Sequence, residues 1–241
     1  MKQAPGSDSG APEAPARTRL KWIVLARRHP SAWLLAVQLL GVLLYPTMEN
    51  MPAGRVVFGV FGMAVLGLAV WVVRRSPLAI WMALLLALPA MVFSVAGVLL
   101  ERHSLTMVAQ VFECLLYFYT TCSLIAYMLQ DHKVTRDELF AAGATFTLLA
   151  WAFAFAYSVC QYWLPGSFTA ASVGELRSWT ELLYLSFSLL SGVGLSDVVP
   201  VYPQARALVM LEQFAGVMYV ALVVSRLVGL AIYKAGRMNA R

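Results

Sequence analysis

Charged residues are scarce in this sequence, because Asp, Glu, Lys and Arg make up only 12% of its 241 residues. Soluble domains contain roughly 25%. Hydrophobic residues make up 61%, and the mean hydropathy is +0.73. A bilayer span needs about 20 mostly apolar residues, so this length allows several spans joined by short loops and leaves no room for a soluble catalytic domain. We therefore expect a membrane protein whose function lies inside the membrane.

Cysteines and catalytic motifs are also scarce. The three cysteines, Cys114, Cys122 and Cys160, lie in apolar runs without a CxxC pair, which indicates buried thiols rather than a disulfide framework. There is no HExxH motif, no GxSxG motif and no Walker loop. We expect no enzyme, no cofactor and no resident metal ion. The formal charge of +6 does not indicate a nucleic-acid partner in a membrane protein. The positions of the basic residues instead indicate which loops are cytoplasmic.

Long apolar runs predict six membrane-spanning helices. Between the fifth and sixth runs lies Trp179–Leu190, which is too short to cross a bilayer and is followed by a glycine-containing segment. That combination predicts a re-entrant helix and loop in an all-α membrane protein. A secondary transporter would instead need paired broken helices. The six runs are Ala32–Met48, Val56–Val73, Leu78–Leu100, Leu105–Leu129, Leu139–Leu164 and about Gln204–Tyr233.

Lys and Arg are distributed unequally over the two predicted sides. The loops on one side hold only Arg55, Arg102, Arg177 and Arg206. By the positive-inside rule, both termini are cytoplasmic and the re-entrant segment enters from the external face. The remaining basic residues lie in the N-terminal segment, at Arg74 and Arg75, at Lys133 and Arg136, and at Arg226, Lys234, Arg237 and Arg241.

The re-entrant segment has the features of a cation path. Ser178 and Glu181 form an S-x-x-E capping box, which predicts a helix beginning there. The carbonyl end of such a helix carries partial negative charge and favours a nearby cation. In the following segment, Ser191–Asp197, Gly192 and Gly194 can adopt positive φ and turn carbonyl groups toward an axis. Non-helical backbone at this depth is tolerated where it is buried or lines water, and a cation path meets that condition.

The run Tyr184–Pro200, YLSFSLLSGVGLSDVVP, resembles the pore helix, filter and exit of the potassium channel superfamily, whose members typically read Y-x-S-F-x-T-x-T-T-V-G-Y-G-D-x-x-P. The resemblance continues through 202–206 and 211–216 to 225–230, and covers about residues 134–233. It implies that Val193 and Gly194 form the centre of a filter, that Asp197 follows it, and that the inner helix bends at Gly216. It also implies a homotetramer in a cell (inner) membrane that passes K⁺ through a backbone-carbonyl filter.

The filter departs from the family pattern at two places. Ser191 and Gly192 replace a pair of threonines, which removes the hydroxyl that helps to coordinate the innermost ion. Leu195 and Ser196 replace Tyr and Gly, and an ordinary L-residue at positive φ costs roughly 1–2 kcal/mol. Two alternatives therefore stay open: a non-selective cation pore, and a non-conducting accessory subunit or membrane scaffold.

Three domains are predicted. Residues 1–31 form a disordered or interfacial segment whose basic residues can meet anionic lipid. Residues 32–133 form a four-helix membrane domain; its fourth span contains no Lys or Arg, so it lacks the charges of a voltage sensor. Residues 134–241 form the pore module, with an outer helix, pore helix, filter and inner helix.

Five residues are predicted to support the pore: Ser178, Glu181, Ser188, Glu212 and Gly216. For Glu212 we expect a role in bracing the pore helix rather than contact with the ion.

Glu113, in the fourth span, has two interpretations. It is either a proton or ion site, or a carboxyl group bonded by Gln110, Tyr117 or another helix, and we favour the second.

Overall fold

The computed structural model describes residues 30–48, 61–62, 64–65, 67–68, 77–130, 136–169 and 175–239. Within these ranges the chain is helical, and its strand-like feature is one isolated antiparallel bridge between Phe168 and Pro200. The fold class predicted from the sequence, an all-helical membrane protein, is confirmed. The helices are α2 (Pro30–Met48), α4 (Pro77–Leu99), α5 (His103–Gln130), α6 (Arg136–Trp163), α7 (Trp179–Leu190) and α8 (Pro203–Asn239).

Five of these helices, α2, α4, α5, α6 and α8, are long and apolar enough to cross a membrane. They coincide with five of the six predicted runs. The remaining run, Val56–Val73, lies mostly outside the described residues, and the six positions described within it are helical. The helix α7 has 12 residues and rises about 18 Å, which is short of the roughly 30 Å hydrocarbon core. It is therefore too short to cross the membrane, as predicted.

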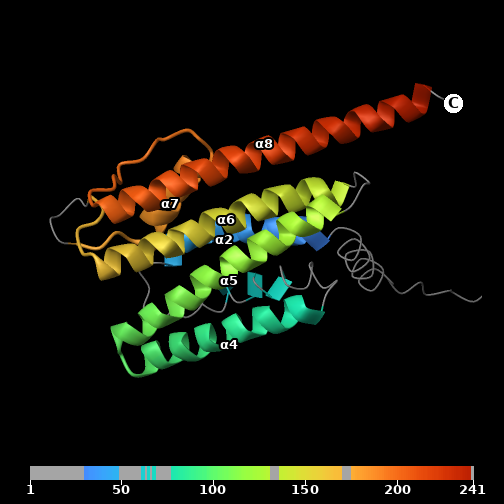
Figure 1. The fold of residues 1–241 in the computed structure, drawn as a ribbon. Helices are drawn as coiled ribbons and strands as arrows, with labels where there is room; N and C mark the ends of the chain where they lie inside the picture. The colour runs from blue at the N-terminus through green and yellow to red at the C-terminus, as the bar shows by residue number, and fades with distance from the viewer. Residues whose placement is uncertain are drawn as a thin grey trace, which may run out of the picture.

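Helix α6 is the central element of the described fold. It packs against α5, α2, α7 and α8, whereas α4 packs against α5 as the outer arm of a hairpin (Figure 1). It is also the most deeply buried of the five spans. Helix α8 lies along α6 and α7, and its C-terminal part extends beyond the ends of the other helices (Figure 1). Helix α7 therefore contacts the spans before it chiefly through α6, and in addition the ring of Trp179 lies 6.5 Å from that of Tyr45 on α2.

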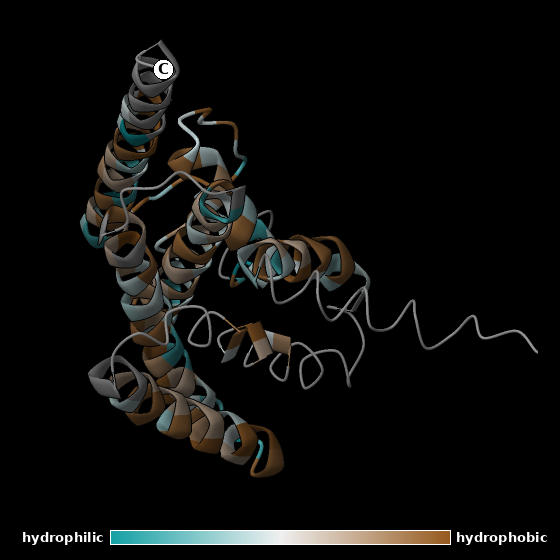
Figure 2. Cartoon of the chain, turned by 90° about the vertical axis from the view of Figure 1, so that its right-hand side faces the viewer, coloured by the Kyte–Doolittle hydropathy of each residue, from teal (hydrophilic) through white to brown (hydrophobic). Residues whose placement is uncertain are grey.

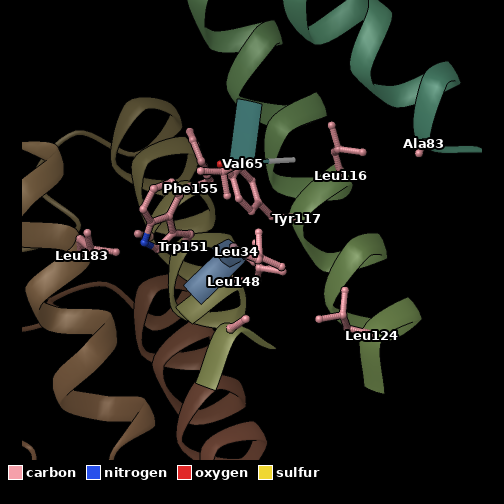
Figure 3. Close-up of a cluster of buried hydrophobic side chains, with 13 residues drawn as sticks. Leu34, Val65, Ala83, Leu116, Tyr117, Leu124, Leu148, Trp151, Phe155 and Leu183 are labelled. Carbon is pink, nitrogen blue, oxygen red and sulfur yellow. The ribbon is translucent and has the colours of Figure 1, made fainter. Parts of the chain in front are cut away.

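The largest buried cluster joins α6 to its neighbours through aromatic side chains (Figure 3). The Tyr117 ring on α5 lies 5.8 Å from that of Trp151 and 5.2 Å from that of Phe155, both on α6. Phe155 in turn lies 4.2 Å from Trp179, the first residue of α7. Leu34 of α2 completes this cluster. The N-terminal end of α7 is thus packed directly on the core of the preceding helices.

The outer faces of the helices are apolar. Hydrophobic residues recur along every helix in Figure 2. On α4, Trp81 and Leu99 are among the most exposed side chains, and on α8 the same holds for Phe214 and Val217. Such faces fit a hydrocarbon environment or contact with another copy of the chain.

Polar contacts join α2 and α8 to the start of α6. The Asp137 carboxylate accepts hydrogen bonds from the backbone N–H and the hydroxyl of Ser31, at 3.1 and 2.9 Å. Next to it, Glu138 forms an ion pair with Arg226 of α8 at 3.2 Å, and both side chains are largely buried. One turn further along α6, the Tyr219 hydroxyl donates to the Ala142 carbonyl. Helix α8 is therefore fixed to α6 at this end of the fold.

Candidate functional site

Helix α7 begins at the predicted capping box. The Ser178 hydroxyl accepts a hydrogen bond from the Glu181 N–H at 3.3 Å, and the Glu181 carboxylate accepts one from the Ser178 N–H at 2.8 Å. Both bonds satisfy N–H groups that the first turn of a helix leaves unpaired. The prediction of a capped helix at Ser178 is confirmed.

The chain turns sharply where α7 ends. The Gly192 N–H donates to the Leu189 carbonyl at 3.1 Å, and the Gly194 N–H donates to the Ser188 carbonyl at 3.0 Å. Gly192 and Gly194 have φ values of +77° and +71°. The prediction of positive φ at both glycines is confirmed. This conformation is strained for any residue with a Cβ, so the alternation of Gly192, Val193 and Gly194 is required by the backbone path.

The backbone of the loop after Gly194 has a different conformation. Among the residues that the structure describes, Glu101 is the one non-glycine residue with positive φ, so Ser196 does not adopt the left-handed conformation that a glycine often has at this place. Instead, the Ser196 hydroxyl accepts a hydrogen bond from the Val198 N–H at 3.1 Å. Val193 and Leu195 are 71% and 67% exposed, so a single chain leaves the loop uncovered.

Arg177 joins three segments around the loop. Its guanidinium lies 2.7 Å from Glu181 on α7 and 3.9 Å from Asp197 after the loop, and it donates to the Thr169 carbonyl. The side chain of Gln161, on α6, holds the Arg177 backbone through two hydrogen bonds of 2.9 Å. Because the Arg177 side chain is only 7% exposed, these partners offset much of the cost of burying its charge.

The roles of Arg177 and Gln161 are not predicted from the sequence. The available signal for Arg177 was its position four residues before Glu181, a spacing that favours an ion pair on a helix. No sequence signal indicates the contact with Asp197, which is 20 residues away along the chain.

The segment after α6 pairs with the segment after the loop. The Thr169 N–H donates to the Val199 carbonyl at 2.9 Å, and the Val201 N–H donates to the Ser167 carbonyl at 2.8 Å. The Thr169 hydroxyl also accepts a hydrogen bond from the Val199 N–H at 2.8 Å. These bonds hold the exit of the loop against the end of α6.

Glu212 lies where α6, α7 and α8 meet, and it is fully buried. Its carboxyl group is in hydrogen-bond contact with the Tyr157 hydroxyl of α6 and the Ser186 hydroxyl of α7. The Ser186 hydroxyl also lies 2.8 Å from the carbonyl oxygen of Ala150 on α6. Glu212 is therefore placed behind α7 and joins the three helices of this region.

Gly216 lies one turn after Glu212 on α8. A Cβ at this position would lie 2.4 Å from the Leu190 carbonyl oxygen at the C-terminal end of α7. The missing side chain thus allows α8 to approach the end of α7 closely. The bend at Gly216 that the resemblance implies stays a prediction.

The backbone carbonyl of Ser188 accepts the hydrogen bonds that hold the turn after α7. Its carbonyl accepts hydrogen bonds from the Gly194 N–H at 3.0 Å and from the Ser191 hydroxyl at 3.2 Å. Its own hydroxyl is buried without a hydrogen-bond partner in the described part of the chain.

The two side chains predicted to bond Glu113 do not do so. Gln110 accepts a hydrogen bond from Ser158 on α6 at 3.1 Å, and no hydrogen bond joins Glu113 to Gln110 or Tyr117. Within the described ranges, His, Cys, Asp and Glu side chains do not gather into a group of three or more that could hold a metal ion.

Residues 144–232 match the family model described as Ion channel. The matched stretch begins within α6, includes α7 and the loop 191–202, and ends within α8. No curated protein and no solved structure matches the chain. The stretch from residue 144 to residue 232 is therefore similar to the ion channel family, in agreement with its resemblance to the potassium channel superfamily.

Proposed function

We propose that four copies of this chain form a cation channel that passes K⁺ through the backbone carbonyls of residues 191–197. In this proposal the channel lies in the cell (inner) membrane with both termini cytoplasmic. The ion channel domain supports conduction in general, and the geometry of the loop supports this particular route.

The loop conformation is the observation that carries the proposal. Two glycines with φ near +70 to +80° flank Val193 directly after the C-terminal end of α7. Alternating backbone conformations of this kind allow successive carbonyl groups to point to one side, where they can replace the hydration shell of a cation. The C-terminal end of α7 adds partial negative charge behind them.

The apolar surface that a single chain leaves exposed supports assembly of several copies. A carbonyl filter needs several loops around one axis, and a single chain leaves Val193 and Leu195 exposed. On α8, large apolar side chains are exposed on several sides. They include Met210, Leu211, Phe214, Val217, Met218, Val220 and Val224. Copies of the chain packed through α8 and the loop would cover part of this surface.

A non-selective cation pore is the second candidate. Gly192 has no hydroxyl for the innermost ion, and Ser196 does not take a left-handed backbone conformation. Both features reduce the number of ordered ligands that distinguish K⁺ from Na⁺.

Ion flux into proteoliposomes tests the proposal. The purified protein is reconstituted after its mass in detergent has been measured, and uptake is followed under K⁺ and Na⁺ gradients separately. We expect a tetramer that admits K⁺ faster than Na⁺. Equal rates would favour the non-selective pore, and absence of flux from a confirmed tetramer would contradict a channel that conducts alone.

A further inference from the structure

The oxygen–oxygen contacts around the Glu212 carboxyl group outnumber the hydrogens that its partners supply. Three oxygen–oxygen contacts run in sequence: Tyr157 hydroxyl to Glu212, Glu212 to Ser186 hydroxyl, and Ser186 hydroxyl to the Ala150 carbonyl. Each contact forms an undivided hydrogen bond only if one hydrogen lies between its two oxygens. Tyr157 and Ser186 supply one hydrogen each, and the Ala150 carbonyl supplies none. A third hydrogen is needed.

An ionised Glu212 leaves two acceptors, its own carboxylate and the Ala150 carbonyl, to share the single hydrogen of the Ser186 hydroxyl. If Ser186 donated to a carboxylate, its oxygen would face the Ala150 carbonyl at 2.8 Å as one acceptor against another. If Ser186 donated to Ala150, its oxygen would face the carboxylate in the same way. A protonated Glu212 removes the conflict, because a carboxylic acid is a donor as well as an acceptor.

The surroundings of Glu212 give an independent reason. The ion pairs among the described residues join Arg177 to Glu181 and Asp197, and Arg226 to Glu138. None includes Glu212, and its side chain is fully buried within the single chain. An unpaired carboxylate in such a place is far more costly than a neutral acid with hydrogen-bond partners.

We propose that Glu212 carries its proton and acts as the central donor of a one-directional hydrogen-bond chain. Tyr157 donates to Glu212, Glu212 donates to the Ser186 hydroxyl, and Ser186 donates to the Ala150 carbonyl. The neutral acid thereby joins the inner helix α8 to the pore helix α7 and the outer helix α6 without placing a charge behind the filter.

The position of this chain makes Glu212 a positioning residue for α7. Glu212 and Gly216 are one turn apart on α8, and their partners Ser186 and Leu190 are one turn apart on α7. The two contacts together fix both the distance and the register between the helices. The link to conduction rests on the proposed function, whereas the protonation state does not.

Infrared spectroscopy tests the protonation directly. The carbonyl-stretch band of a protonated carboxylic acid is compared between the wild type and Glu212→Gln in lipid at neutral pH. We expect one acid band in the wild type to be missing from Glu212→Gln. Glu181→Gln is the matched control, because it makes the same substitution at a carboxyl group that is paired with Arg177. An unchanged spectrum in this band for Glu212→Gln would overturn the proposal.

Thermal unfolding of the detergent-solubilised protein gives a second readout. The amide of Glu212→Gln can accept from Tyr157 and donate to Ser186, so it reproduces a protonated acid. We expect Glu212→Gln to unfold close to the wild-type temperature, and Glu212→Leu and Ser186→Ala to unfold lower. If Glu212→Gln unfolds at as low a temperature as Glu212→Leu, the neutral acid is contradicted. In that case the site needs a carboxylate that accepts hydrogen bonds at both oxygens, which an amide cannot do.

Flux separates this inference from the proposed function. If the channel conducts, Glu212→Leu should pass K⁺ about tenfold more slowly than Glu212→Gln. Leucine leaves the buried hydroxyls of Tyr157 and Ser186 without their partner, and we expect this to displace α7. Equal flux in the two variants would remove the positioning role. If no variant and no wild type conducts, the proposed function fails, and the infrared result still decides the protonation state.

Discussion

Two glycines determine the backbone path of the proposed filter. Their positive φ was predictable, because G-x-G directly after a capped helix leaves few other conformations. The contacts of Arg177 were not predictable, since they join residues 169, 177 and 197 through a fold that no local pattern encodes. The backbone conformation at Ser196 was not predictable either, because this residue does not adopt the positive φ of the glycine that it replaces.

Gly194→Ala should strongly reduce flux while leaving the fold intact. A Cβ at Gly194 would meet no neighbouring atom in the single chain, but its φ of +71° costs an alanine roughly 1–2 kcal/mol. Four such residues would face one axis in a tetramer. We expect K⁺ flux to fall by at least about tenfold in proteoliposomes, since 1.4 kcal/mol corresponds to that factor. Gly229→Ala is the control, because it lies within α8 in open space; equal flux in both variants would exclude a carbonyl filter at Gly194.

Arg177→Gln should destabilise the segments that Arg177 joins around the loop. It removes the ion pair with Glu181 and the contact with Asp197, and the amide cannot reproduce the fork of donors. We expect a loss of about 1–3 kcal/mol in the free energy of unfolding, followed by chemical denaturation in detergent. Arg102→Gln, at an exposed arginine between α4 and α5, should change it by less than about 0.5 kcal/mol. A similar effect in both variants would contradict the positioning of the outer segment by Arg177.

At the scale of elements, the sequence predicts which segments are helical but not how they pack. Apolar runs locate five spans, and the capping box with the short apolar run locates α7 with the bounds that the structure shows. The central place of α6 could not be predicted, because every span is apolar on most of its faces and hydropathy does not distinguish lipid from protein as a neighbour. Small and aromatic residues on α6, such as Ala144, Ala152 and Trp151, decide that packing.

Gly216→Ala should separate α8 from α7. Its Cβ would lie 2.4 Å from the Leu190 carbonyl oxygen, which belongs to the backbone and cannot rotate away. Overpacking of this kind typically costs about 1–3 kcal/mol, so we expect a lower unfolding temperature and altered flux. Gly229→Ala on the same helix again serves as the control. If the two variants unfold at the same temperature, the close approach of α8 to α7 is wrong.

At the scale of the whole molecule, α8 connects the loop end of the pore module to the opposite end, where Arg226 meets Glu138. The positive-inside rule uses Arg226 only as a cytoplasmic marker, and no sequence pattern pairs it with an acid on α6. The resemblance predicted the order of outer helix, pore helix and inner helix, because that order follows from the motif. The contacts that hold the two long helices together required the structure.

A double-mutant cycle tests the coupling of α6 and α8 through Glu138 and Arg226. Because both side chains are largely buried, removal of either partner should cost about 1–3 kcal/mol in the free energy of unfolding. Glu138→Gln with Arg226→Gln should lose less than the sum of the single losses. Glu181→Gln with Arg226→Gln should be additive within about 0.5 kcal/mol, since Glu181 lies at the other end of the pore module. Additivity in the first pair would show that the ion pair does not couple the helices.

If the loop 191–197 of four copies conducts K⁺ through backbone carbonyls, its current should be selective for K⁺ over Na⁺. The most direct test is the reversal potential of currents through the purified tetramer in a planar bilayer, with K⁺ on one side and Na⁺ on the other. We expect a reversal potential whose sign opposes the diffusion of K⁺, and we expect the current to be lost in Gly194→Ala. Absence of current from a verified tetramer, or a current unchanged by Gly194→Ala, would contradict it.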